Sequence, residues 1–139
     1  MERKRLNTRM KTLRIMIVED ESIIALDIRY IVQHLGYEVP AMAASGEESI
    51  DKAGSIHPDL ILMDIQLKGR MDGISAAEKI QRSYDIPVIY LSAFGDDVTL
   101  ERINRDRPFG FIQKPFSESE LEETIERLLR PPNEIRPSR

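Results

Sequence analysis

Short apolar runs alternate along the chain with longer segments in which apolar residues recur every three or four positions. The mostly apolar runs span residues 13–18, 60–64, 87–91 and 109–112. Runs of this length are typical of strands that are buried on both faces of a parallel sheet. A fifth, weaker strand is expected at 38–43, where Pro40 favours the edge of a sheet because it cannot donate a backbone hydrogen bond.

The segments between these runs have helical periodicity and recognisable ends. Helices are predicted after Glu21 and up to Gly36, from the Ser45–Glu48 motif to His57, over 73–84, over about 96–105, and from Ser117 to 129. Two of them begin with the Ser-x-x-Glu pattern of a capping box. The helix at 96–105 is charged and poorly periodic. Strands that alternate with helices predict a single α/β domain, a doubly wound parallel sheet with helices on both faces.

The ends of the chain differ from this predicted domain. Residues 1–12 form a basic segment that we expect to be a flexible arm, residues 13–130 form the folded domain, and residues 131–139 form a polar tail. The 139 residues include no cysteine, which excludes disulfides and thiol chemistry, and no apolar run approaches the length of a membrane span. The formal net charge of −4 argues against a nucleic-acid-binding body. Because the sequence also shows no secretory signal and no membrane span, we expect a cytoplasmic protein without direct membrane or nucleic-acid contacts.

Polar side chains follow the apolar runs, at the ends where ligands bind in open parallel sheets. They are Glu19, Asp20, Asp64, Ser92 and Lys114. Asp64 ends the most continuous apolar run, and a lone charge at such a position is costly unless something pairs with it. The sequence therefore predicts that three carboxylates, a hydroxyl and an ammonium meet at one edge of the sheet.

Three clustered carboxylates repel one another unless a cation lies among them. Oxygen ligands favour a hard cation, and Mg²⁺ is usually held by one or two carboxylates together with water and a phosphate oxygen. A cation, a hydroxyl and a lysine around one free carboxylate are suited to phosphoryl transfer. Asp64 is the expected nucleophile, and the product would be an aspartyl phosphate.

Five short motifs in order make the chain resemble the receiver domains of two-component response regulators, the CheY-like family. The matching segments are Ile17–Glu21, Leu62–Asp64, Met71–Gly73, Leu91–Ala93 and Phe111–Phe116. The resemblance covers about residues 13–129. It implies a flavodoxin-like sheet of five strands in the order 2-1-3-4-5, and a non-enzymatic signalling role.

The resemblance also implies roles for the acidic residues. Asp64 would accept a phosphoryl group from a sensor histidine kinase. Asp20 and Asp64 would bind Mg²⁺ directly, with Mn²⁺ as a possible substitute, and Glu19 would bind it through water. The backbone carbonyl of Gln66 would be a further ligand.

Other positions would sense the phosphoryl group. Ser92 and Lys114 would contact its oxygens, and Phe111 would be the switch aromatic that turns inward when Ser92 moves. The Lys114–Pro115 bond would be cis, a form that X-Pro bonds adopt at low cost. The face formed by the fourth helix, the fifth strand and the fifth helix would then dock an unknown downstream protein, although a merely solvated face explains its charges equally well.

Several positions depart from the family pattern. The acidic pair is Glu19-Asp20 rather than two aspartates, and Ser92 replaces the commoner threonine. The loop after Asp64 lacks the usual proline and is one residue longer. Phe111 has no hydroxyl, which excludes a switch that works through a tyrosine oxygen.

The residues two positions after Asp64 and after Ser92 would flank the path of a hydrolytic water. These are Gln66, which could orient water, and Phe94, which could shield the acyl phosphate. We predict that shielding by Phe94 dominates and that the phosphoryl group persists.

Three other functions deserve comparison with the signalling switch. A Mg²⁺-dependent phosphatase or phosphotransferase with an aspartyl nucleophile is the main alternative, but such enzymes usually carry a second aspartate at the position of Gln66. A nucleotide-binding module lacks support because neither glycine-rich phosphate motif is present. A pseudo-receiver that is never phosphorylated is disfavoured by the complete acidic set. The sequence does not indicate the oligomeric state, and His34 and His57 lack the context of a phosphotransfer histidine.

Overall fold

The computed structural model describes residues 12–93, 101–103 and 107–129, and it shows a five-stranded parallel sheet. The strands are β1 (Ile15–Val18), β2 (Met42–Ala43), β3 (Leu60–Asp64), β4 (Val88–Ser92) and β5 (Phe109–Gln113). The helices are α2 (Ser22–His34), α3 (Gly46–Ile56), α4 (Gly73–Tyr84) and α5 (Glu118–Leu129). The strand order β2-β1-β3-β4-β5 confirms the predicted topology.

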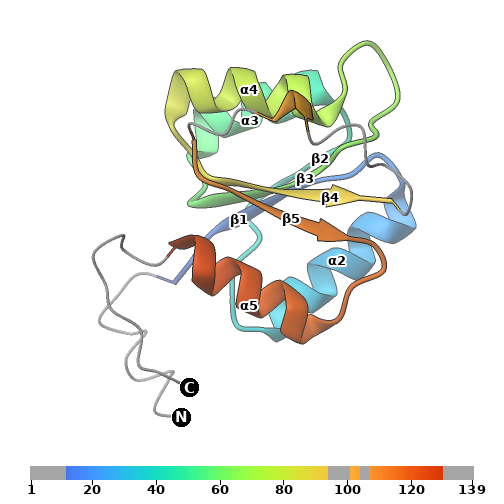
Figure 1. Cartoon of the computed structure of the whole chain (residues 1–139), viewed down its shortest axis with the longest axis vertical. Helices are drawn as coiled ribbons and strands as arrows, with labels where there is room; N and C mark the ends of the chain where they lie inside the picture. Colours follow the sequence, from blue (N-terminus) through green and yellow to red (C-terminus); the bar gives the residue numbers. More distant parts are fainter. Residues whose placement is uncertain (1–11, 94–100, 104–106, 130–139) are drawn as a thin grey trace.

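The helices form two layers around the sheet. Figure 1 shows α3 and α4 on one face and α2 and α5 on the other. Every residue of β1, β3 and β4 is buried, because side chains that alternate along these strands enter two separate cores. This double burial explains why the strands read as continuous apolar runs.

Asp64 is held in place by the strand that carries it. Leu60 and Leu62 pack toward α2 and α5, while Ile61 and Met63 pack toward α3 and α4, and all four are fully buried. Burial of one such side chain contributes roughly 1.5–3 kcal/mol relative to exposure. β3 lies between β1 and β4, so Asp64 stands at the middle of the sheet edge with little freedom to move.

The capping motifs predicted from the sequence are formed. The Ser45 hydroxyl accepts a hydrogen bond from the Glu48 backbone N–H at 3.0 Å at the start of α3. At the start of α5, the Ser117 hydroxyl accepts from the Glu120 N–H at 3.1 Å, and Glu120 Oε1 accepts from the Ser117 N–H at 2.9 Å. The α5 box is thus reciprocal, whereas Glu48 at α3 accepts from the Ala44 N–H instead of the Ser45 N–H, and both serines cap the helix starts that the sequence predicts.

The structure differs from the sequence prediction mainly at element ends. The second strand is only two residues long, although an isolated bridge joins Arg14 to Glu38. Pro40 has no N–H to donate, which accounts for the interruption between that bridge and β2. β1 starts at Ile15 rather than at residue 13, and β4 and β5 each continue one residue past the predicted end.

Some sequence predictions concern residues outside the described ranges. They are Phe94, the tail at 131–139, nearly all of the arm at 1–12, and most of the helix predicted at 96–105. Of that last segment, the structure describes 101–103, where a short 3₁₀ turn precedes the buried Ile103. Across the described parts of the chain, no helix has both the length and the apolar character needed to cross a membrane.

Candidate functional site

The carboxyl ends of β1 and β3 bring three acidic side chains together. Glu19 and Asp20 directly follow β1, and Asp64 is the last residue of β3. One carboxylate oxygen from each of the three lies within 4.8 Å of the others. These residues line a cavity of about 380 Å³ together with Gln66, Lys68 and Lys114, among others.

Lys114 supplies a positive charge among these carboxylates. Its ammonium nitrogen lies 3.2 Å from Glu19 Oε1 and 3.6 Å from Asp64 Oδ1. The Lys114 backbone N–H donates to the Ser92 carbonyl at 2.7 Å, and the following peptide bond to Pro115 is cis. The lysine is thus anchored at its backbone while its side chain bridges two carboxylates.

Burial changes the proton affinity of Asp64. The residue is 5% exposed, and loss of hydration raises the pKa of its carboxyl from 3.8 to about 6. The ammonium of Lys114 opposes this rise, and the negative charge of Glu19 adds to it. The Gln66 backbone N–H donates to Asp64 Oδ1 at 3.2 Å and also favours the ionised form. The buried carboxylate is therefore only partly compensated by its protein neighbours.

Backbone donors orient the other two carboxylates. Asp20 Oδ2 accepts a hydrogen bond of 2.8 Å from the Lys68 N–H, and Glu19 Oε2 accepts one of 3.1 Å from the Glu21 N–H. Each of these acids uses one carboxylate oxygen for the backbone. Asp20 Oδ1 forms no hydrogen bond within the described residues and is available to a ligand.

The donor set suits a hard divalent cation. All the side-chain ligands are oxygen atoms, as Mg²⁺ prefers, and opposite ligands of Mg²⁺ stand about 4.2 Å apart when each bond is near 2.1 Å. The 4.8 Å limit on the three carboxylate oxygens therefore requires only small side-chain movements or an intervening water. Glu19, Asp20 and Asp64 fit a Mg²⁺ or Mn²⁺ ion, and the ion would relieve their mutual repulsion.

The start of α4 closes against the end of β3. A Cβ atom at Gly73 would lie 2.0 Å from the Asp64 carbonyl oxygen, so any larger residue would displace the strand end. The Gly73 N–H donates to the Ile65 carbonyl at 2.9 Å, and Asp72 caps α4 by accepting from the Ser75 N–H at 2.9 Å. This contact explains physically why the Met71–Gly73 segment accompanies an aspartate at this strand end.

Ser92 and Phe111 are not among the residues that line the acidic cavity. Ser92 is 2% exposed, and its hydroxyl donates to the Ala93 carbonyl at 3.0 Å. Phe111 is partly buried, pairs with Tyr90 across β4 and β5, and packs on the core next to α3 and α4. The structure thus brings Glu19, Asp20, Asp64, Gln66 and Lys114 together. The Ser92 hydroxyl bonds to the Ala93 carbonyl rather than to any of these five residues.

Sequence reasoning missed two features of the site. Lys68 lines the acidic cavity, and Arg102 forms an ion pair with Asp72 and donates to the Ser75 hydroxyl at 3.1 Å. This ion pair lowers the pKa of Asp72. The unusual loop after Asp64 gave a signal for Lys68, whereas no local pattern marks Arg102 as a partner of a helix cap thirty positions away.

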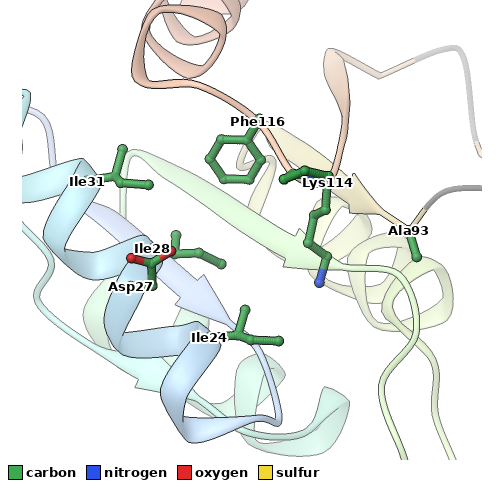
Figure 2. Close-up of a pocket in the computed structure, with 8 residues that line it drawn as sticks. Ile24, Asp27, Ile28, Ile31, Ala93, Lys114 and Phe116 are labelled. Carbon is green, nitrogen blue, oxygen red and sulfur yellow. The ribbon is translucent and has the colours of Figure 1, made fainter.

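An apolar groove adjoins the acidic cavity. Its volume is about 420 Å³, and it runs between α2 and the segment that joins β5 to α5. Figure 2 shows Phe116 facing Ile31 across the groove, with the Lys114 ammonium toward the end where Ile24 and Ala93 lie. Ile24, Ala93 and Lys114 line both hollows, so the groove is continuous with the acidic site.

Comparison with known proteins relates this geometry to one family. The family model described as "Response regulator receiver domain" matches residues 15–126. The transcriptional regulatory protein PdtaR of Mycobacterium tuberculosis is 35% identical over 113 residues, which are 81% of this chain and 55% of PdtaR. The chain therefore spans about half the length of such curated relatives.

Solved structures agree with this relationship. The signal receiver domain of a modulated diguanylate cyclase from Desulfovibrio desulfuricans superposes with a TM-score of 0.78 at 29% identity, covering 86% of this chain and 94% of that one. The response regulator REC domain of PhyR from Erythrobacter litoralis gives a TM-score of 0.73 at 30% identity, covering 91% and 99%. From its motifs, its sheet order and its match over residues 15–126, this chain belongs to the response regulator receiver family of two-component signalling.

Proposed function

We propose that the protein is a phosphoacceptor whose Asp64 takes a phosphoryl group from a sensor histidine kinase. The observation that carries this proposal is the position of Asp64, a rigidly held carboxylate with two other carboxylates and the Lys114 ammonium around it. A nearby cation stabilises a buried carboxylate in this setting, and so does a reaction that spreads its negative charge over more atoms.

The proposed reaction is a phosphoryl transfer between two side chains. An Asp64 carboxylate oxygen attacks the phosphorus of a phosphohistidine, and the new P–O bond forms as the P–N bond breaks. The electron pair of the broken bond returns to the imidazole nitrogen, which takes up a proton from solvent. Lys114 stabilises negative charge on the phosphoryl oxygens, as its position between Glu19 and Asp64 supports.

Metal binding completes the proposed site. Asp20 and Asp64 would hold Mg²⁺ directly and Glu19 would hold it through water, with Mn²⁺ as a substitute, and the Gln66 carbonyl would be a further ligand. When bound, the ion supplies positive charge for the carboxylates and for the incoming phosphoryl oxygens. Asp64 keeps its second carboxylate oxygen for attack on phosphorus.

We propose that the switch acts through residues next to the site. Ser92 and Phe111 lie on neighbouring strands, the Ser92 hydroxyl donates to the Ala93 carbonyl, and Phe111 is partly buried. Reorientation of the Ser92 hydroxyl toward the phosphoryl group would free space for Phe111 to move inward. A downstream protein would then read the altered surface near β5 and α5.

The adjoining groove supports access by a protein donor. Its apolar walls meet the acidic cavity at Lys114, so a donor protein seated there would place a phosphohistidine beside Asp64. PdtaR is named as a transcriptional regulator, but this chain matches only part of its length. We therefore propose partner switching for this chain, and assign no DNA contact to it.

Intact mass spectrometry after incubation with acetyl phosphate and Mg²⁺ tests this function. Wild type and Asp51→Asn, a control on the exposed side of α3, should each gain one phosphoryl group. Asp64→Asn should gain none, and removal of the metal with EDTA should suppress the gain in wild type. An equal gain in Asp64→Asn would contradict the assignment. Catalytic release of phosphate from simple phosphomonoesters would favour the alternative of a Mg²⁺-dependent aspartyl phosphatase.

A further inference from the structure

The loop that follows β3 carries a lysine at the mouth of the acidic cavity. Lys68 is exposed and lines this cavity, and its backbone N–H donates to Asp20 Oδ2 at 2.8 Å. A proline at this position would have no N–H to donate. The hydrogen bond to Asp20 therefore ties the backbone of this residue to the acidic cluster.

The Lys68 ammonium is available for a ligand. Among the residues that the structure describes, it forms no ion pair, whereas the Lys114 ammonium already contacts two carboxylates. A lysine side chain extends about 6 Å from its Cα atom on a flexible four-carbon stem. Because its backbone is bonded to Asp20 and the residue lines the same cavity as Asp64, a side chain of this length brings the ammonium into range of a group bound in that cavity.

The negative charge at the site exceeds what one divalent metal ion and Lys114 can neutralise once a phosphoryl donor is present. Three carboxylates and the Lys114 ammonium carry two net negative charges, which a divalent metal ion neutralises. A phosphoryl donor that approaches as a dianion restores two uncompensated negative charges. A mobile ammonium at the cavity mouth would offset one of them at close range.

From this geometry we infer that Lys68 binds the phosphoryl oxygens of the incoming donor and aligns the donor with Asp64. The ligand is a dianionic phosphoryl donor, whether a phosphohistidine on a protein or a small phosphoramidate. The inference rests on the proposed phosphoacceptor function and adds a donor-binding residue to it. Lys68 thereby differs from Lys114, which the structure places inside the cavity between the acids.

A charge at the cavity mouth must act with opposite sign on the two ligands of the site. Loss of the Lys68 ammonium weakens attraction of the phosphoryl dianion and strengthens attraction of the metal cation. A general loosening of the loop would weaken both, because the loop also orients Asp20. The two affinities together therefore separate a charge effect from a structural one.

The test compares Lys68→Met and Lys68→Arg with wild type and with Lys79→Met. Lys79 is an exposed lysine on α4 that does not line the acidic cavity, so its variant controls for net charge. Phosphoramidate serves as donor at fixed Mg²⁺, and intact mass gives the rate at each donor concentration. Calorimetry or amide chemical shifts give Mg²⁺ affinity in the absence of donor.

For Lys68→Met, the donor concentration that gives half the maximal rate should rise by roughly threefold to tenfold, and Mg²⁺ should bind about twofold more tightly. Both effects should shrink as ionic strength increases. Lys68→Arg and Lys79→Met should resemble wild type. Unchanged donor dependence in Lys68→Met, parallel weakening of donor and Mg²⁺, or failure of Lys68→Arg to preserve donor binding would overturn the inference. A wild type that accepts no phosphoryl group would instead overturn the proposed function.

Discussion

Replacement of Asp64 by asparagine should stabilise the metal-free protein. Asp64 is 5% exposed, and burial raises the pKa of its carboxyl from 3.8 to about 6. The folded state therefore holds the ionised carboxylate at a cost, and a rise in pKa of this size corresponds to about 3 kcal/mol of unfolding free energy. Asparagine removes this charge and keeps an oxygen that can accept from the Gln66 N–H.

The stabilisation should depend on pH with a defined sign. A carboxyl with a raised folded-state pKa contributes most to stability below its unfolded pKa, and that contribution is lost as the pH rises through the folded pKa. The wild type should therefore lose stability relative to Asp64→Asn between about pH 4 and pH 6. Above pH 6 the variant should be more stable by about 1–3 kcal/mol, and near pH 4 the two should converge.

Urea unfolding in EDTA, followed by far-ultraviolet circular dichroism from pH 4 to pH 8, measures this difference. Asp72→Asn is a control of opposite sign, because Arg102 lowers the pKa of Asp72 and the ionised form is favoured there. That variant should gain no stability at neutral pH. An Asp64→Asn protein that is less stable than wild type at pH 7.5, or a difference that does not change with pH, would refute the electrostatic account of the site.

Three further changes probe other contacts of the site. In Gly73→Ala, the new Cβ would collide with the Asp64 carbonyl. The free energy of unfolding in urea should therefore fall by about 1–3 kcal/mol, and Asp64 should be phosphorylated more slowly. A variant with unchanged stability and rate would contradict the close approach of Gly73 to Asp64. Lys114→Met should raise the pKa of Asp64 further, measured by NMR titration of the metal-free protein, since the lysine charge now lowers that pKa; a fall would contradict the ion pair. Arg102→Ala should raise the pKa of Asp72 toward its ordinary value. The free energy of unfolding should fall by under about 1 kcal/mol, because the ion pair is partly exposed. An unchanged pKa of Asp72 in the same NMR titration would exclude the contact.

Apolar patterning was sufficient to predict the layers of the fold. β1, β3 and β4 are buried on both faces, so their sequences carry no polar break, and the capping serines at 45 and 117 mark the starts of two helices. The strand at 38–43 was predicted too long. Its pairing depends on an edge contact with β1 and on the missing N–H of Pro40, which local patterning does not capture.

The acidic cluster was predictable because parallel strands end at the same edge. Glu19, Asp20, Asp64 and Lys114 lie at the ends of apolar runs or within two residues of them, so the topology alone brings them together. The orientation of the Ser92 hydroxyl toward Ala93 was not predictable, because it depends on one side-chain rotation at a strand end.

Contacts made by loop residues were not predicted from the sequence. The hydrogen bond from the Lys68 N–H to Asp20 joins residues 48 positions apart, and the ion pair between Arg102 and Asp72 joins residues 30 positions apart. Neither pair belongs to a periodic pattern, and each depends on the path of a loop. The first of these contacts joins two residues that line the acidic cavity, and the second lies at the start of α4.

Locating the phosphoryl group within the chain tests the proposed role of Asp64 most directly. Protein treated with a phosphoryl donor and Mg²⁺ is reduced with borohydride, which converts an acyl phosphate on aspartate to homoserine, and is then mapped by peptide mass spectrometry. Homoserine is expected at position 64 and at no other acidic residue. Homoserine at Asp20 or another aspartate, 5-hydroxynorvaline (the corresponding reduction product of a glutamyl phosphate) at Glu19, or a phosphorylated protein with no reducible acyl phosphate would contradict that assignment.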